Sequence, residues 1–243
     1  MKPDHLGTLL VLLAGLAAWQ ILAVVAGGAG IASPAQTITA LRRLLADPGF
    51  WRDVAETGRA FGLSLAIVLA GGIALGLVLG TSRLAGEVTE PILVTLYALP
   101  KVTLYPVVLL LFGLGLSARV AFGVMHGVIP LTLFAMNAVL RMRPVYLRTA
   151  ATMRLTRWQT VATVIWPAIL PEIYAGARLA VSLTLLGVLI GEMFASQRGL
   201  GHLAVGAMER GDMASVLAVA LLLTGFAVTI NAALLALDRT RQR

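Results

Sequence analysis

Long runs of apolar residues constrain this chain more than any other feature of its sequence. The first run, residues 6–30, is long enough as a helix to cross the hydrocarbon core of a membrane, given a rise of about 1.5 Å per residue. No small-residue cleavage site stands out around it, so we expect it to remain as a first span. We therefore predict an all-α integral membrane protein with about six transmembrane helices. The further runs lie at about residues 60–80, 91–113, 118–140, 173–194 and 214–237.

The low content of charged residues supports a membrane location. Charged residues make up 12% of the 243 residues, whereas a soluble domain of this length carries about 25%. Cysteine is absent, so neither a disulfide framework nor a thiolate metal site is expected. The net charge of +8 could indicate a nucleic-acid partner, but the arginines cluster at the ends of the apolar runs, where lipid headgroups and topology account for them. We therefore expect no nucleic-acid partner.

The connection between the first two runs is amphipathic. It begins at Ser33, is interrupted at Pro48, carries charges of both signs and includes Trp51, a residue type favoured at membrane interfaces. We predict that it lies on the outer surface of the membrane. On this basis the chain divides into an N-terminal part, 1–56, and a membrane core, 57–243.

Two of the apolar runs contain unusual residues. Gly72, Gly76 and Gly80 recur at four-residue spacing in the second run and predict one smooth face for close helix packing. The third run has Lys101 near its middle and is interrupted by prolines. These prolines are Pro91, Pro100 and Pro106.

The distribution of basic residues predicts the orientation of the chain. Six spans place both termini on one side, and ten of the 19 basic residues fall on that side. The arginines of the other side are offset by acidic residues in the same loops. Because positively charged loops stay in the cytoplasm, we predict that both termini and the segment 141–157 are cytoplasmic.

The segment from Arg141 to Pro171 is the longest polar interruption of the apolar pattern. It holds five of the chain's 17 arginines and no acidic residue. A plain cytoplasmic loop would explain the charge through the positive-inside rule. Apolar residues at roughly helical spacing and prolines near both ends instead favour a structured helix pair that a soluble partner grips.

No catalytic motif is visible in the sequence. The chain has no GxxxxGK[ST] phosphate-binding loop, no HExxH or GxSxG motif and no carboxylate pair spaced for acid–base catalysis. Its three histidines, His5, His126 and His202, are far apart, which argues against a histidine metal site. Transport, conduction or a structural role remain, and we do not expect an enzyme.

The run AATMRLTRWQTVATVIWPAILPEIYAGARLAVSLTLLGVLIGEMFASQRGLGHL, residues 150–203, and SPAQTITAL before the second span are distinctive. In their order and spacing they resemble the inner-membrane permeases of binding-protein-dependent ABC importers. The sulfonate, taurine and nitrate branch is the most similar. The resemblance covers about residues 33–237.

That family carries a cytoplasmic motif, EAA-x3-G-x9-I-x-L-P, which can be placed on this chain without gaps. Val164, Trp166 and Pro167 take the places of I, L and P, and Arg154 takes the place of the glycine. The right half of the motif therefore matches, and the left half lacks its Glu and Gly. At EAA stand Arg148, Thr149 and Ala150.

The resemblance implies a type I ABC importer permease fold, with the loop 141–171 forming a coupling helix. Two such subunits would form the pathway, two ATPase subunits would bind the cytoplasmic loops, and a periplasmic binding protein would deliver the solute. This chain would bind no cofactor, while ATP and magnesium would bind to the ATPase. The location implied is the bacterial inner membrane.

The same resemblance implies which residues contact the ATPase. Ala150 is expected to permit close approach. Arg154 in place of glycine is open to two explanations: it pairs with an acidic groove of a dedicated ATPase, or it marks one degenerate half of a heterodimer. The expected coupling residues are Arg148, Thr149, Ala150, Met153, Arg154, Arg157, Trp158 and Pro167.

Polar residues within the apolar runs are candidates for the translocation pathway. A lysine in mid-membrane costs about 2.5 to 3.5 kcal/mol on insertion scales, so Lys101 is expected to face water, a partner or an anion, unless it snorkels from nearer the interface. Tyr97 and Tyr105 would share its face. His126 also suits a helix–helix hydrogen bond, and Glu192 either an outer gate or a pair with Arg198.

A buried cation favours an anionic solute such as a sulfonate, although pyrimidine or flavin precursors are also open. The rival class is a stand-alone channel or secondary transporter. Such a protein needs no structured basic helix in the cytoplasm.

Overall fold

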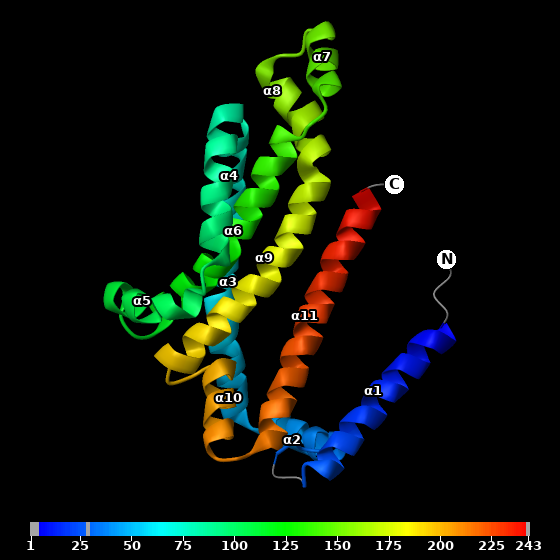
Figure 1. Cartoon of the computed structure of the whole chain (residues 1–243), viewed down its shortest axis with the longest axis vertical. Helices are drawn as coiled ribbons and strands as arrows, with labels where there is room; N and C mark the ends of the chain where they lie inside the picture. Colours follow the sequence, from blue (N-terminus) through cyan, green and yellow to red (C-terminus); the bar gives the residue numbers. More distant parts are fainter. Residues whose placement is uncertain (1–4, 28–29, 242–243) are drawn as a thin grey trace.

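The computed structural model describes residues 5–27 and 30–241, which contain helices and no strand (Figure 1). The all-α prediction is therefore confirmed. In chain order the helices are α1 (His5–Val25), α2 (Pro34–Ala46), α3 (Pro48–Gly80), α4 (Arg83–Ala98), η1 (Lys101–Leu104), α5 (Tyr105–Phe112), α6 (Leu116–Leu140), α7 (Pro144–Thr152), α8 (Arg157–Thr160), η2 (Val161–Ile165), α9 (Trp166–Ala195), α10 (Leu200–Glu209) and α11 (Met213–Arg241).

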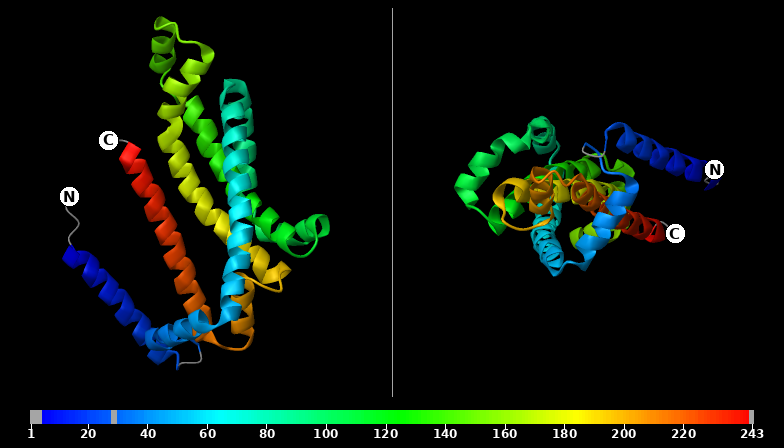
Figure 2. Two further views of the ribbon diagram at one scale, coloured as in Figure 1. Left: turned by 180° about the vertical axis from the view of Figure 1, so that it is seen from behind. Right: turned by 90° about the horizontal axis from the view of Figure 1, so that it is seen from below.

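Three long helices, α3, α6 and α9, form the centre of the molecule (Figures 1 and 2). Val68 of α3, Leu131 of α6 and Ala180 of α9 are fully buried in one shared apolar cluster. The other long helices lie around this centre. The functional segments described below are therefore held by one packed unit.

The glycine face predicted on the second run packs against α6, as expected. A Cβ added to Gly76 would lie 2.5 Å from the Ala135 Cβ and 2.7 Å from the Thr132 carbonyl oxygen. Gly72 and Gly80 likewise meet α6, and all three glycines are buried. Helices in a membrane attract one another mainly through close packing, so these glycines set how near α3 and α6 can approach.

Replacing Gly76 by alanine should therefore destabilise the fold by about 1–3 kcal/mol, because the added methyl group overpacks the α3–α6 contact. Gly71→Ala is the matched control, since a Cβ at Gly71 has nothing within 4 Å. Thermal unfolding of both purified variants in one detergent tests this. Equal melting temperatures would contradict it.

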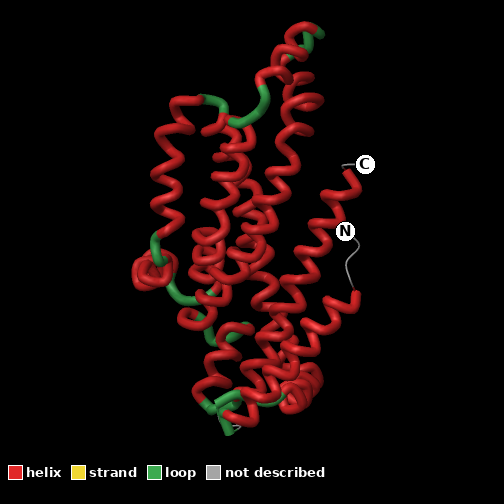
Figure 3. Tube along the Cα trace, turned by 45° about the vertical axis from the view of Figure 1, so that its right-hand side comes forward, coloured by secondary structure: helices red, strands yellow, loops and turns green. Residues whose placement is uncertain are grey.

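Five helices of the described chain are long and apolar enough to cross a membrane, and the bent pair formed by α4 and η1–α5 makes a sixth if it is one span. This agrees with the prediction of about six spans. Figure 3 shows that the connections between helices are short.

The third predicted span, 91–113, is not a straight helix. It starts earlier, at Arg83, and bends by 82° between α4 and η1–α5. Leu99 adopts an extended conformation at the break, as expected for the residue before Pro100. Pro91, by contrast, lies inside α4 without breaking it.

Two other predicted boundaries also move. The second span starts at Pro48 rather than near residue 60, with the Asp47 carboxylate accepting a 2.9 Å hydrogen bond from the Gly49 N–H. The proposed division at residues 56 and 57 therefore falls inside α3. The fifth span, predicted from residue 173, belongs to a helical path that runs from Trp158 to Phe194.

The two terminal helices lie at one edge of the molecule. α1 extends away from the centre, and α11 lies nearer to it (Figures 1 and 2). Both terminal ends point toward the end of the molecule that carries α7 and α8 (Figure 1). This arrangement agrees with an even number of crossings.

Candidate functional site

A helical hairpin formed by α7 and α8 projects from one end of the molecule, beyond the ends of the other helices (Figure 1). The sequence TRWQ begins α8: the Thr156 N–H donates to Gln159 Oε1 at 2.9 Å, and the Gln159 N–H donates to Thr156 Oγ1 at 3.3 Å. These reciprocal hydrogen bonds form a capping box. The basic segment is therefore a structured helix pair, as the sequence pattern favoured, and not a plain loop.

The turn between α7 and α8 depends on Arg154. Its φ of 52° is the only positive φ of a non-glycine residue in the described part of the chain. The Arg154 N–H donates to the Ala151 carbonyl at 3.0 Å, and the Leu155 N–H donates to the Ala150 carbonyl at 3.1 Å. This is the Schellman pattern of a helix C-terminus, whose left-handed position usually holds glycine. The family motif has glycine at this position, so the structure gives that preference a physical reason.

Arg154→Gly should stabilise the turn by about 1–2 kcal/mol, because glycine avoids the steric cost of a left-handed backbone. Arg154→Ala keeps the Cβ while removing the charge and should not gain this stability. Hydrogen exchange at the Leu155 amide measures the difference. Exchange that slows equally in both variants would contradict the assignment.

The structure exposes most of the expected coupling residues. Met153 is 66% exposed and Trp158 is 77% exposed; many apolar side chains of the spans are also exposed, but these two lie on the hairpin that projects beyond the other helices (Figure 1). Ala150 is 2% exposed and packs inside the chain, so it does not offer the contact surface expected of it. Arg157 is also an expected coupling residue, but it is not among the residues whose side chains the structure describes. The other exposed residues of the set are Arg148, Thr149, Arg154 and Pro167.

A π-helical turn, η2, joins α8 to α9. The Trp166 N–H donates to the Val161 carbonyl, five residues earlier. Turns of this kind are rare and occur frequently at functional sites. The helical path is therefore continuous from the hairpin through η2 into α9.

A buried polar cluster lies at the other end of α9. The Glu192 side chain is 0% exposed, and its Oε2 accepts 2.9 Å hydrogen bonds from the Thr57 hydroxyl and the Gly201 N–H. The Arg119 Nη1 lies 3.7 Å from Glu192 Oε1, and its Nη2 donates to Glu56 at 2.9 Å. We call Glu56, Thr57, Arg119 and Glu192 the Glu192 cluster. It joins α3, α6 and α9 to the start of α10.

The cluster also holds the N-terminus of α10. The Leu200 N–H donates to Thr57 Oγ1, and the Gly199 N–H donates to Asp53 Oδ1, both at 2.9 Å. Carboxylates are favourable near a helix N-terminus, where N–H groups lack helical partners. Arg119 is a residue of this cluster that no sequence pattern indicated. Its wide separation in sequence from Glu56 and Glu192 left no local signal.

Glu192→Ala should destabilise the protein by about 3–5 kcal/mol, because it removes the buried acceptor of the Thr57 hydroxyl and the Gly201 N–H together with the buried carboxylate beside Arg119. Glu192→Gln keeps an oxygen for Thr57 and Gly201 and should cost less. Denaturant unfolding in detergent checks the order, with Glu209→Ala as the exposed control. A Glu192→Ala protein as stable as the control would contradict it.

The candidate pathway residues make mostly local contacts. Lys101 is 8% exposed, and its Nζ donates to the Tyr97 carbonyl at 2.9 Å, so it caps the C-terminal end of α4 and does not face an open path. The Tyr105 ring packs on Phe122. His126 Nδ1 lies 2.8 Å from the Phe122 carbonyl, within its own helix.

Glu192 is buried against Arg119 rather than paired with Arg198, so it does not form an open mouth in this structure. Tyr97 is 38% exposed and remains accessible. Among the described residues, no group of three His, Cys, Asp or Glu side chains is placed to hold a metal ion.

Known structures share this fold. A chain of the MetNI methionine ABC transporter, solved in inward facing conformations, superposes with a TM-score of 0.63 at 19% identity, covering 80% of this chain and 95% of that chain. The arrangement of spans is therefore the type I fold of ABC importer permeases, as the resemblance implied.

The chain belongs to the family described as binding-protein-dependent transport system inner membrane component, whose model matches residues 72–243. It is a permease subunit of a binding-protein-dependent ABC importer, a multi-pass protein of the inner membrane that works with an ATPase and a substrate-binding protein. The resemblance found from the sequence is thus confirmed.

Relatives with known names cover most of the chain. A probable ABC transporter permease protein of Haemophilus influenzae is 26% identical over 95% of this chain and 94% of its own length. The taurine transport system permease protein TauC of Escherichia coli is 26% identical over 80% of this chain and 70% of its own length. The formylaminopyrimidine transport permease protein ThiX of Halalkalibacterium halodurans is 30% identical over 65% of this chain and 63% of its own length.

Proposed function

We propose that this permease carries a small organic solute with an anionic group of the sulfonate type and is driven through its α7–α8 hairpin. The observation that supports coupling to an ATPase is the exposed, structured hairpin with Met153 and Trp158 on its surface. The relative TauC, named for taurine, supports the solute class. The sequence also favoured an anionic solute because Lys101 was expected to be a free buried cation. Since Lys101 Nζ donates to the Tyr97 carbonyl, that second argument no longer supports the solute class.

The coupling would work mechanically. The hairpin enters a groove of an ATPase subunit, and closure of the ATPase moves it as a unit. η2 passes this movement to α9, which packs along α6. Spans four and five then rock relative to the partner permease.

We further propose a dimer of permease subunits, either two copies of this chain or two different chains, with two ATPase subunits. The chain itself performs no catalysis and binds no cofactor, while ATP and magnesium bind to the ATPase. Both termini and the hairpin face the cytoplasm of a bacterial cell. The common direction of the terminal ends and α7 supports this orientation (Figure 1).

The pathway would run beside the half-exposed Tyr97 and the half-buried His126. Three other candidate residues would affect the pathway indirectly. Lys101 and Tyr105 would stabilise the bend after α4, and Glu192 would stabilise the N-terminus of α10. A rocking movement could open this packing to solvent.

Arg154→Glu should uncouple transport, because it reverses the charge offered to the ATPase at the turn. The double change Arg154→Ala with Arg157→Ala should likewise abolish ATP-dependent uptake of labelled taurine into vesicles that contain the ATPase and the binding protein. Arg198→Glu, an exposed arginine at the other end of the molecule, serves as the control.

Unchanged uptake in the Arg154→Glu protein would remove the docking role of Arg154. A stand-alone channel would behave differently, since its conductance in a planar bilayer would survive the double change. Arg154→Gly separates charge from geometry: it keeps the turn and removes the cation. Full uptake with this variant and none with Arg154→Glu would show that a negative charge at the turn is not tolerated and that a positive charge is not required.

A further inference from the structure

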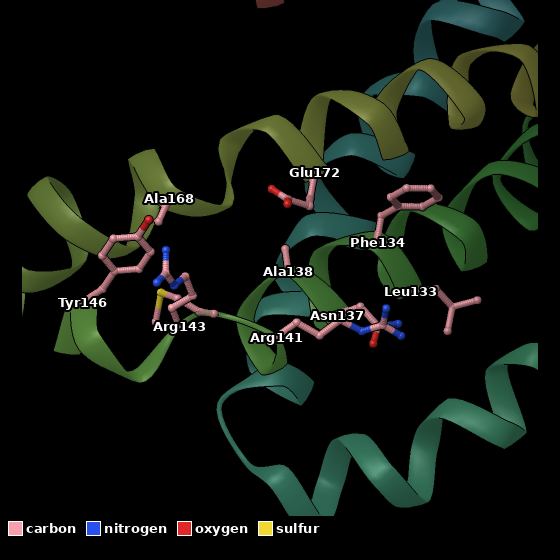
Figure 4. A pocket seen from close by; sticks show the side chains of 10 residues that line it. Leu133, Phe134, Asn137, Ala138, Arg141, Arg143, Tyr146, Ala168 and Glu172 are labelled. Carbon is pink, nitrogen blue, oxygen red and sulfur yellow. The ribbon is translucent and has the colours of Figure 1, made fainter. Parts of the chain in front are cut away.

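A cavity of about 510 Å³ opens where α6 ends and α7 begins, between these segments and α9 (Figure 4). This volume lies in the range of about 300–1,000 Å³ typical of small-molecule sites. Phe134 and Ala138 of α6 and Ala168 of α9 form its apolar part. The polar residues that line it are Asn137, Arg141, Arg143, Tyr146 and Glu172.

Charges of opposite sign face this cavity without neutralising one another. Arg141 and Arg143 belong to the α6–α7 connection, and Glu172 belongs to α9 across from it (Figure 4). None of these three side chains forms an ion pair, within 4.0 Å, or a side-chain hydrogen bond with another described residue. All three are exposed and so are free to meet a ligand.

Two further polar groups are available at the same place. Asn137 Nδ2 donates to Glu90 Oε1 at 3.1 Å, which leaves the side-chain oxygen Oδ1 of Asn137 free to accept a hydrogen bond. The Tyr146 hydroxyl is also without a partner among the described residues and can donate or accept.

The charge pattern restricts the chemistry of a ligand. A simple anion would suit the two arginines but would meet the Glu172 carboxylate, and a simple cation would meet the arginines. A zwitterion satisfies both sides. Guanidinium groups bind tetrahedral oxyanions in charge-assisted, often bidentate geometry, and a carboxylate binds an ammonium group.

We propose that this cavity binds a compact zwitterion, in which a short chain joins an ammonium group to a sulfonate or phosphate group. Two sources share this chemistry: a soluble aminoalkyl sulfonate, and the phosphatidylethanolamine headgroup of the membrane. Arg143 and Arg141 hold the oxyanion, Glu172 holds the ammonium, and Phe134 lies beside the linking carbons. A ligand bound in this way bridges the base of the hairpin to α9.

The purified full-length chain, in detergent free of phosphatidylethanolamine, is titrated calorimetrically with taurine and separately with sodium sulfate. We expect taurine to bind and sulfate to bind at least tenfold more weakly. Glu172→Gln and Arg143→Gln should each weaken taurine binding at least tenfold. Glu87→Gln, which alters an exposed glutamate of α4 outside the cavity, should leave it unchanged.

Native mass spectrometry of the chain in nanodiscs with equal phosphatidylethanolamine and phosphatidylglycerol tests the lipid source. Taurine binding that both variants weaken supports the soluble source, and retained phosphatidylethanolamine that both variants lose supports the headgroup. The proposal is overturned if neither probe is held, if the variants bind like the wild type, or if sulfate binds as tightly as taurine. Because these measurements involve no ATPase and no uptake, their failure leaves the proposed import function standing.

Discussion

The close approach of α3, α6 and α9 is the contact on which the rest of the structure depends. Lipid tails are as apolar as leucine, so hydrophobicity alone does not bring helices together within a membrane. Here glycines remove the side chains that would separate them: Gly76 faces Ala135, and Gly187 of α9 faces the backbone of α6 at Phe122. Backbones that lie this close cannot slide or rotate independently. The three helices therefore form one tightly packed unit that connects the two ends of the molecule.

A different set of polar interactions stabilises each end of this unit. At one end, a capping box at Thr156 and a left-handed turn at Arg154 define the conformation of the hairpin. At the other end, Glu192 and Arg119 join α9 to α10 through interactions that are costly to break where water is excluded. Between them, the 82° break after α4 keeps the third span from packing as a straight rod. This continuous packing is compatible with the proposed coupling, in which closure of a partner ATPase changes access to the pathway.

Some of this could be predicted because the signals are local. The apolar runs predicted the helices, the spacing of Gly72, Gly76 and Gly80 predicted a packing face, and Thr156 with Gln159 lies in a segment that resembles the family. Boundaries were less certain, since Asp47 and Pro48 start α3 well before its apolar part. Lys101 was predicted to face water, a partner or an anion, or to snorkel toward the interface, because a sequence cannot show which carbonyl lies within reach. Ala150 was assigned to a surface for a similar reason: a small residue fits both a docking face and an internal contact.

By itself, the sequence determined that the chain is a helical membrane protein, which family it belongs to, and that a basic segment interrupts its spans. Those properties follow from composition, periodicity and motif spacing, which are local to the chain. Only the tertiary structure decided that Arg119 lies between Glu56 and Glu192, and that Arg141, Arg143 and Glu172 surround one cavity. These groups are brought together by the packing of α3, α6 and α9. The strength of their electrostatic interactions depends on burial and on distances in space, and neither can be read from the order of residues.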